Sequence, residues 1–172
     1  LIDLPLIMMA KGRLMRFRNQ NTYENMVKAG EESAFHSRYE RALERFSQSL
    51  EVETRYESVI DGKQVSTGKY FQDHSPMDTG LVVGEFSMGG EREASMALDS
   101  ARRAFQTWSV MDLDKRLTIF RKAAEIMRRD LFEIAAAVTF DNGKNRYEAV
   151  GEVDEAIDFI SYYAEQMEIS HG

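Results

Sequence analysis

The chain of 172 residues has a formal net charge of −7, and 43% of its residues are hydrophobic and 30% charged. This composition is typical of a soluble globular domain with its own core. The negative charge argues against a nucleic-acid surface and against binding to anionic lipid, because both need clustered basic residues. Cysteine is absent. Its absence excludes disulfides, zinc–thiolate sites and a cysteine nucleophile within these residues, and it fits a reducing, cytoplasmic location.

Residues 1–18 are expected to form a poorly ordered tail, and residues 19–172 the structured part of the chain. The opening segment from Leu1 to Ala10 is apolar, but it is too short to span a bilayer. It lacks a basic start and is interrupted by Asp3 and Pro5, so it is not interpreted as a targeting signal.

The first structured segment predicts helix. Tyr23 to Lys28 fits one or two helical turns that end at Gly30. Between residues 31 and 50, apolar residues recur at helical spacing in an otherwise charged segment, which predicts an amphipathic helix that packs on one face. The members of this stripe are Phe35, Tyr39, Leu43, Phe46 and Leu50.

Short β-strands are predicted next, separated by turn residues. Asp61-Gly62 lies between two β-prone runs, and an Asp-Gly pair supplies the two positive-φ positions that a two-residue hairpin needs. A second turn contains Ser75-Pro76 and Thr79-Gly80. The predicted strands cover residues 58–60, 63–65, 69–73 and 81–86.

Four helices are predicted after the strands, so the fold class is α+β. The first covers about residues 91–108 and the third about residues 131–140. The second opens at Asp112 and the fourth at Asn145, both good N-cap residues, and Asn142-Gly143 is a C-cap signal. The predicted faces are Ala94, Leu98, Ala101, Phe105 and Trp108 on the first helix; Leu113, Leu117, Phe120, Ala124 and Met127 on the second; and Ala149, Val153, Ala156, Ile160, Ala164 and Met167 on the fourth.

The last predicted helix is acidic. Its carboxylates are Glu152, Asp154, Glu155 and Asp158, and most of them are interpreted as a solvated face. Glu155 differs, because at 100° per residue Phe159 and Tyr162 lie within about 40° of it, roughly opposite the predicted core face. A helix with apolar groups on two faces is usually packed on two sides. Glu155 is therefore expected to face an interface or a cleft.

Other chemical signatures are weak. No glycine-rich phosphate motif follows a predicted strand. The segment from Asp141 to Lys144 resembles an anion-binding turn, but it is interpreted as a helix C-cap followed by a new helix. His36, His74 and His171 are far apart in the sequence, and none has a partner at metal-ligand spacing. We therefore assign no catalytic, cofactor-binding or metal-binding residue.

An ordered set of short motifs resembles the N-terminal part of the aldehyde dehydrogenase family. The motifs are Ile60-Asp61-Gly62-Lys63, Ser75-Pro76, Val82-Val83-Gly84, Ala101 to Phe105 with Trp108, Arg116, Ala123-Ala124, Met127 to Arg129, Asn142 to Lys144, Glu148-Ala149, Glu155 to Phe159 and Tyr162 to Ala164. No single motif is specific to this family, but the complete set in this order along the chain is. The run from Glu155 to Phe159 and the upstream Phe17-Arg18-Asn19 are most similar to the 1-pyrroline-5-carboxylate dehydrogenase branch. Asp141 and Ser75 depart from the family, which usually has Glu and Asn there.

The resemblance implies an α/β parent enzyme with a Rossmann-like cofactor domain. Residues 19–172 would form the N-terminal part of its cofactor-binding and oligomerisation region. In the family a cysteine thiolate attacks the aldehyde, hydride passes to NAD or NADP, and water activated by a glutamate hydrolyses the thioester. The family's cysteine, glutamate base and glycine-rich cofactor turn lie after the segment represented here. The chain is therefore expected to be catalytically incomplete and to bind no cofactor alone.

The same resemblance implies a substrate pocket beside the last helix. The branch oxidises glutamate γ-semialdehyde to glutamate in proline catabolism. The position that matches Glu155 faces the substrate pocket in the family, and Phe159, one helical turn later, is expected to line the pocket with it.

Three interpretations follow. The first is an N-terminal fragment of an aldehyde dehydrogenase, and the second is a non-catalytic assembly or regulatory subunit that binds a full-length enzyme. The third, with the resemblance set aside, is a small helical interaction module. Exposed apolar helix faces predict self-association or binding to the remainder of a dehydrogenase subunit. Nucleic acid and membranes are not expected as partners.

Overall fold

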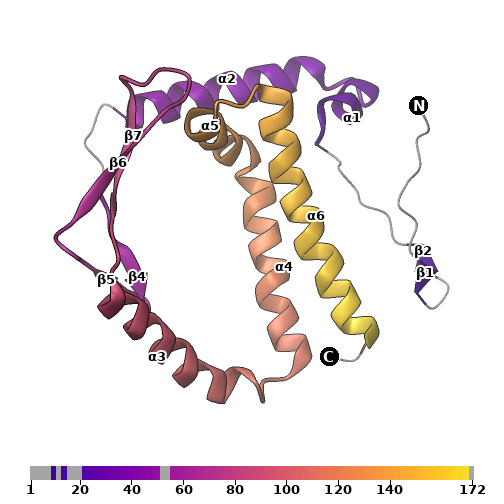
Figure 1. The fold of residues 1–172 in the computed structure, drawn as a ribbon. Coiled ribbons are helices and arrows are strands. Elements are labelled where there is room, and N and C mark those ends of the chain that lie inside the picture. The colour runs from indigo at the N-terminus through magenta and orange to yellow at the C-terminus, as the bar shows by residue number, and fades with distance from the viewer. Residues whose placement is uncertain (1–8, 11–12, 15–20, 51–54, 171–172) are drawn as a thin grey trace.

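The computed structural model describes residues 9–10, 13–14, 21–50 and 55–170. A group of helices forms one side of the molecule, and a β-strand arm followed by one helix forms the other (Figure 1). The helices are α1 (Tyr23–Lys28), α2 (Glu32–Ser49), α3 (Glu91–Trp108), α4 (Leu113–Arg129), α5 (Leu131–Asn142) and α6 (Arg146–Ser170). The strands are β1 (Met9–Ala10), β2 (Arg13–Leu14), β3 (Arg55–Tyr56), β4 (Ser58–Ile60), β5 (Lys63–Val65), β6 (Tyr70–His74) and β7 (Val82–Ser87).

The α+β class and the four C-terminal helices are confirmed. The tail predicted for residues 1–18 lies outside the described residues except for β1 and β2, so its poor order stays a prediction. None of the helices in the described ranges combines the length and the apolar character that crossing a membrane requires.

The hydrophobic core lies where α6 packs against α4 and α5, with α2 lying across α5. The side chains at the centre of this core are almost fully buried. They include Phe35, Tyr39, Leu131, Ala135, Ala136, Val150 and Ile157. Ala135 and Ala136 of α5 and Ala149 and Val150 of α6 are fully buried, and such small side chains allow two helix backbones to approach closely. Phe35, Tyr39, Leu43 and Phe46 of the predicted stripe are confirmed as the packing face of α2. Leu50, the fifth predicted member, follows the end of α2 and is not part of the core cluster.

The β-strand arm is built around β7. Strand β7 pairs antiparallel with β6 and parallel with β3, and β4 and β5 form the separate hairpin predicted from Asp61-Gly62. Both turn residues have positive φ, 57° at Asp61 and 69° at Gly62, as such a hairpin requires. At Gly84 a Cβ atom would lie 2.8 Å from the Tyr56 ring, so only glycine fits beneath that ring.

The arm joins the helical core at the end of α5. The hydroxyl of Ser75 donates a hydrogen bond of 2.6 Å to the carbonyl oxygen of Phe140. Gly143 ends α5 in the left-handed conformation (φ 71°), and a Cβ atom there would lie 3.1 Å from Pro76. The Asp141 to Lys144 segment is thus confirmed as a helix C-cap. Asn145 then caps α6, because its side-chain oxygen accepts from the backbone N–H of Tyr147 (3.0 Å) and of Glu148 (3.2 Å).

Two carboxylates of α6 contradict the prediction of a solvated acidic face. Asp154 is 2% exposed and Asp158 is 6% exposed. The Asp154 carboxylate accepts hydrogen bonds from the backbone N–H of Asn21 (3.1 Å) and from its side-chain amide (3.2 Å). At Asp154 the interpretation was wrong because Asn21, two residues before α1, contacts this face of α6, and helical spacing does not reveal a contact across 133 residues.

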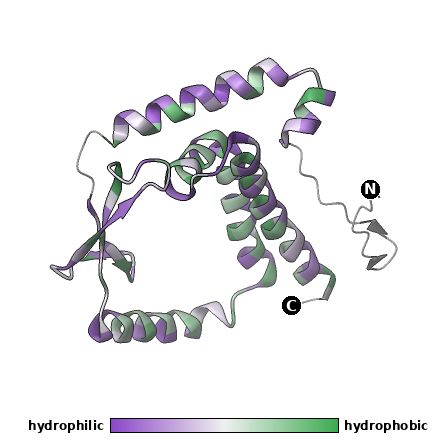
Figure 2. Ribbon diagram, turned by 45° about the horizontal axis from the view of Figure 1, so that its top comes forward, coloured by the Kyte–Doolittle hydropathy of each residue, from purple (hydrophilic) through white to green (hydrophobic). Residues whose placement is uncertain are grey.

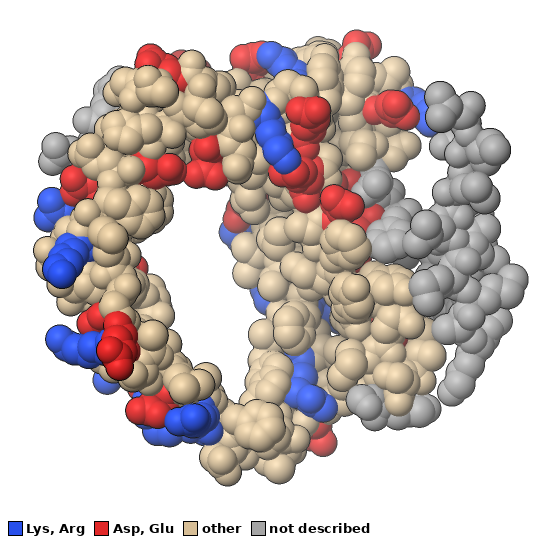
Figure 3. Space-filling model, viewed as in Figure 1, with Lys and Arg blue, Asp and Glu red and all other residues tan. Residues whose placement is uncertain are grey.

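The face predicted for α3 is present but uncovered. No residue of α3 is buried against the described part of the chain, and Leu98 and Phe105 are 52% and 61% exposed. Figure 2 shows apolar residues along α3 as well as along α4 and α6. In Figure 3 an opening separates the arm from the α4–α6 side, and charged side chains follow the outer edge of α3. Met167, predicted in the core face of α6, is 38% exposed.

Replacement of Asp154 by alanine is expected to destabilise the fold by about 1–3 kcal/mol, because Asn21 loses both acceptors at a part-buried site. Urea denaturation of the two proteins measures the difference. The control is Glu125→Ala, which removes an exposed ion pair with Lys122 and should change the free energy of unfolding by about 0.5 kcal/mol or less. Equal effects of the two substitutions would contradict the structural role of Asp154.

A pH dependence is expected where β6 meets α5. A hydrogen bond with the Asp73 carboxyl, reinforced by burial and by the charge of Asp73, raises the pKa of Asp141. A carboxyl whose pKa is raised by folding stabilises the fold below its unfolded value of about 4, and this contribution is lost as pH rises through the raised value. Asp73→Asn should therefore raise the melting temperature relative to the unmodified chain by more at pH 7 than at pH 4. A difference that does not change with pH would refute the shared-proton contact.

Candidate functional site

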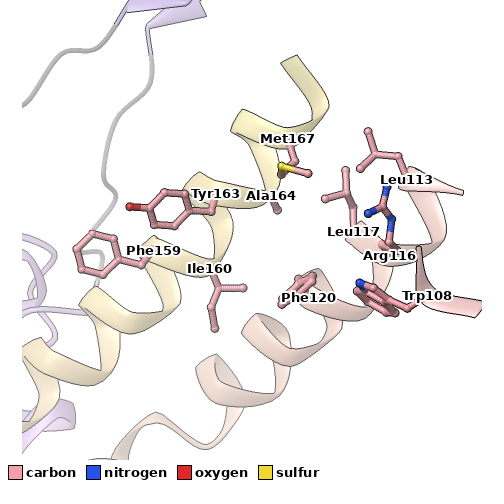
Figure 4. Close-up of a pocket in the computed structure, with 10 residues that line it drawn as sticks. All are labelled: Trp108, Leu113, Arg116, Leu117, Phe120, Phe159, Ile160, Tyr163, Ala164 and Met167. Atoms are coloured by element: carbon pink, nitrogen blue, oxygen red, sulfur yellow. The ribbon is translucent and has the colours of Figure 1, made fainter. Parts of the chain in front are cut away.

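A groove between α4 and α6 has a volume of about 430 Å³. Figure 4 shows its side chains projecting from the two helices, with Trp108 at the end of α3 closing one side. The lining residues are Trp108, Leu113, Arg116, Leu117, Phe120, Phe159, Ile160, Tyr163, Ala164 and Met167. All except Arg116 present mainly apolar surface, so the groove is suited to apolar groups.

The groove arises from a mismatch in side-chain size along two packed helices. Leu117 and Ala164 are 3% and 5% exposed and form its floor, where the small alanine leaves space. Phe120, Phe159 and Tyr163 form the walls and are between 42% and 61% exposed. The Trp108 and Phe120 rings meet edge to face, with centroids 6.4 Å apart, which fixes the end of α3 against α4.

Arg116 is the one charged residue among the lining side chains. Its Nε atom is buried and has no hydrogen-bond partner within the described residues. Five residues later on the same helix, Arg121 forms an ion pair of 2.8 Å with Glu168 of α6. Arg116 is part-exposed as a whole, so this one N–H group is the donor that lacks a partner in the apolar groove.

The two residues predicted to line a substrate pocket have different positions. Phe159 lines the groove and stacks on Tyr163, with ring centroids 6.3 Å apart and planes 21° apart. Glu155, one turn earlier on α6, is exposed and is not among the groove-lining residues. The structure therefore brings Phe159 together with Tyr163 and Arg116 but leaves Glu155 outside the groove. A role for either residue toward substrate stays a prediction.

Arg116 and Trp108 were not predicted as site residues. The helical stripe of α4 was read from its apolar members alone, and Arg116 entered only as one motif of the family resemblance. The available signal was its position directly before Leu117, since a long arginine side chain next to a core residue can lie along the apolar surface.

The histidines have structural contacts. Arg146 donates to Nδ1 of His36 at 3.0 Å, and Nδ1 of His74 lies 2.8 Å from the carbonyl oxygen of Thr79. His171 lies outside the described residues. Within the ranges that the structure covers, no three His, Cys, Asp or Glu side chains are grouped in a way that could hold a metal ion.

Residues 63–172 match the profile of the aldehyde dehydrogenase family. The chain belongs to this family. Curated relatives include 1-pyrroline-5-carboxylate dehydrogenase 1 of Halalkalibacterium halodurans, 37% identical over 135 residues, and the 1-pyrroline-5-carboxylate dehydrogenase of Bacillus pumilus, 34% identical over the same length. Each match covers 78% of this chain and 26% of the relative, so the chain spans about a quarter of these enzymes.

Solved structures show the same likeness. A Thermus 1-pyrroline-5-carboxylate dehydrogenase with bound NAD matches with a TM-score of 0.73 and 35% identity, over 76% of this chain and 25% of that one. Proline utilization A of Bdellovibrio bacteriovorus matches with a TM-score of 0.78 and 30% identity, over 95% of this chain and 16% of that one. The resemblance predicted from the sequence, to the aldehyde dehydrogenase family and within it to 1-pyrroline-5-carboxylate dehydrogenases, is therefore confirmed.

The groove of this aldehyde dehydrogenase segment is expected to bind an apolar dye such as 1-anilinonaphthalene-8-sulfonate. Trp108 is the sole tryptophan of the chain and borders the groove, so binding should transfer excitation energy from Trp108 to the dye. Phe120→Asp should weaken this transfer at least fivefold by placing a charge in the apolar wall. Ile119→Asp, an exposed neighbour outside the lining, is the control and should leave the signal within twofold. Equal losses would show that the dye binds elsewhere.

Proposed function

We propose that this chain is the N-terminal part of a 1-pyrroline-5-carboxylate dehydrogenase, which with the remainder of its subunit oxidises glutamate γ-semialdehyde to glutamate. The main support is the similarity to enzymes of that name in both sequence and fold over three quarters of the chain. NAD is the proposed cofactor, since one similar Thermus structure has NAD bound. The acidic, cysteine-free composition suits a cytoplasmic enzyme.

The proposed contribution of this chain to the enzyme is structural support and one wall of the substrate entrance. The reaction needs a thiolate that attacks the aldehyde, and these residues contain no cysteine. The residues available for the entrance lie on α6, where Glu155 is exposed and Phe159 faces the groove beside it. The substrate bears an α-ammonium group, and an exposed carboxylate at the entrance would pair with it.

A chimeric enzyme tests this proposal. The 135 matched residues of the Halalkalibacterium halodurans relative are replaced by those of this chain, and NADH formation from glutamate γ-semialdehyde is followed by absorbance. We expect turnover within tenfold of the parent enzyme. A chimera that folds and retains its NAD affinity but shows no turnover would refute the proposed function.

Within the chimera, Glu155→Gln is expected to raise KM for the semialdehyde about tenfold, the equivalent of about 1.4 kcal/mol, and to leave kcat within about twofold. The reason is the loss of the charge that pairs with the substrate ammonium group. Glu168→Gln, on the same helix, removes an exposed ion pair with Arg121 and is the control, with KM unchanged. An unchanged KM in both variants would contradict the proposed role of Glu155 in binding the substrate. It would leave the proposal that the enzyme is a 1-pyrroline-5-carboxylate dehydrogenase untouched.

A second candidate function is a non-catalytic subunit that assembles with a full-length dehydrogenase. It is favoured by α3, whose apolar residues Leu98 and Phe105 are more than half exposed. Co-elution of the 172-residue chain with the intact Halalkalibacterium enzyme on size-exclusion chromatography would support it. Separate elution at micromolar concentrations would exclude it.

A further inference from the structure

The dipeptide Asn142-Gly143 at the end of α5 carries chemistry beyond its role as a helix C-cap. Asparagine followed by glycine is the pair that most readily closes into a cyclic imide, because glycine has no Cβ to hinder its backbone nitrogen as it approaches the asparagine side chain. Asparagine is among the thermolabile residues of proteins. Both residues are exposed in this structure, so water reaches the site.

The fold requires the glycine of this pair. Gly143 has a φ of 71°, in the left-handed region, and a Cβ atom there would lie 3.1 Å from Pro76 of the β-strand arm. Any other residue would strain the backbone and crowd the joint between the arm and α5. The labile pair therefore persists because the end of the helix needs glycine.

The side-chain amide of Asn142 lies against a pair of carboxyl groups. Its Nδ2 atom donates a hydrogen bond of 2.8 Å to Oδ2 of Asp141. A hydrogen bond with the Asp73 carboxyl, reinforced by burial, raises the pKa of Asp141. A carboxyl that shares a proton and touches the amide nitrogen can relay protons to and from that nitrogen as it departs.

The attacking nitrogen is held by one hydrogen bond. The backbone N–H of Gly143 donates to the carbonyl oxygen of Thr139 at 2.9 Å, where α5 ends. Helix ends open locally at little cost in free energy, and the opened chain can turn until the nitrogen of Gly143 faces Cγ of Asn142. The pair Asp61-Gly62 is not equivalent, because Ser100 (3.3 Å) and Arg103 (3.7 Å) hold the Asp61 carboxylate.

We propose that Asn142 is a self-modification site, at which the backbone nitrogen of Gly143 attacks the side-chain amide carbon and releases ammonia. The bond from this nitrogen to Cγ forms, the bond from Cγ to Nδ2 breaks, and the proton of the attacking nitrogen leaves with the ammonia. Water then opens the cyclic imide at either carbonyl, which gives aspartate or isoaspartate at position 142. The sequence of steps consumes one water and needs no oxidant or cofactor.

The product changes the joint between the β-strand arm and the core. Either form places a third carboxylate beside Asp73 and Asp141, and like charges in contact repel. Isoaspartate also lengthens the backbone by one carbon directly before Gly143, whose φ and contact with Pro76 fix the end of α5. The modification is therefore expected to weaken this joint.

The reaction is measured by incubation of the 172-residue chain at neutral pH, with peptide mapping by mass spectrometry at intervals. Conversion of the amide at Asn142 is expected to be at least about tenfold faster than at Asn145. Asn145 is an internal control, because it is also exposed but precedes Arg146, whose side chain hinders imide formation. Its side-chain oxygen is also held in the α6 cap. Equal rates at the two asparagines, or no conversion at Asn142, would overturn the proposal.

The effect on the joint is measured on the modified chain, which anion exchange separates by its additional negative charge. Its melting temperature at pH 7 is expected to fall by about 2 °C or more, and by less at pH 4, where the carboxyls are largely protonated. Asn142→Asp should reproduce this pH-dependent fall, whereas Asn145→Asp keeps an N-cap acceptor and should not lower the melting temperature. Equal melting temperatures of the modified and unmodified chains at pH 7 would overturn the proposed effect on the joint.

Discussion

The contact of α6 with α4 and α5 is the interaction on which the rest of the structure depends. Helix α6 is 25 residues long and contributes Val150, Val153 and Ile157 to the core, each nearly inaccessible to solvent. An isolated helix gains little from propensity alone, so its stability comes from this burial. The other elements are arranged around it: α2 lies across α5, the β-strand arm is joined to the end of α5, and α1 is reached through Asn21.

Helix α6 also carries buried charge. Asp154 lies on the side of α6 that contacts Asn21, and there its carboxylate accepts from two donors of that residue. An apolar residue at that position would bury more hydrophobic area but would leave the donors of Asn21 unpaired. The carboxylate therefore fixes where α1 begins relative to α6, which a purely apolar contact would fix less specifically. The same helix presents Phe159 and Tyr163 to the groove on its other side.

Local rules were sufficient for the hairpin and for the helix limits, because the deciding signals lie within a few residues. Asp61-Gly62 and Gly143 specify positive φ, and Asn145 specifies a cap, whatever surrounds them. Long-range contacts were not predictable in this way. The parallel pairing of Arg55 and Tyr56 with β7 spans about thirty residues, and the burial of Asp154 depends on Asn21, 133 residues earlier. At the groove, periodicity identified most of the apolar members but not the buried, unpartnered Nε of Arg116, which only the three-dimensional structure reveals.

The uncovered face of α3 and the groove between α4 and α6 have one physical explanation. Helix α3 has 18 residues and an apolar face, yet none of its residues is buried against the described chain. Such a helix gains almost no hydrophobic stabilisation from its present contacts. An apolar helix face without a packing partner is unfavourable in water, and so is the buried Nε of Arg116 without an acceptor. Trp108 joins the two features, because it ends α3 and borders the groove. A neighbour that packed on Trp108 and Phe120 would therefore contact the end of α3 and the groove at once.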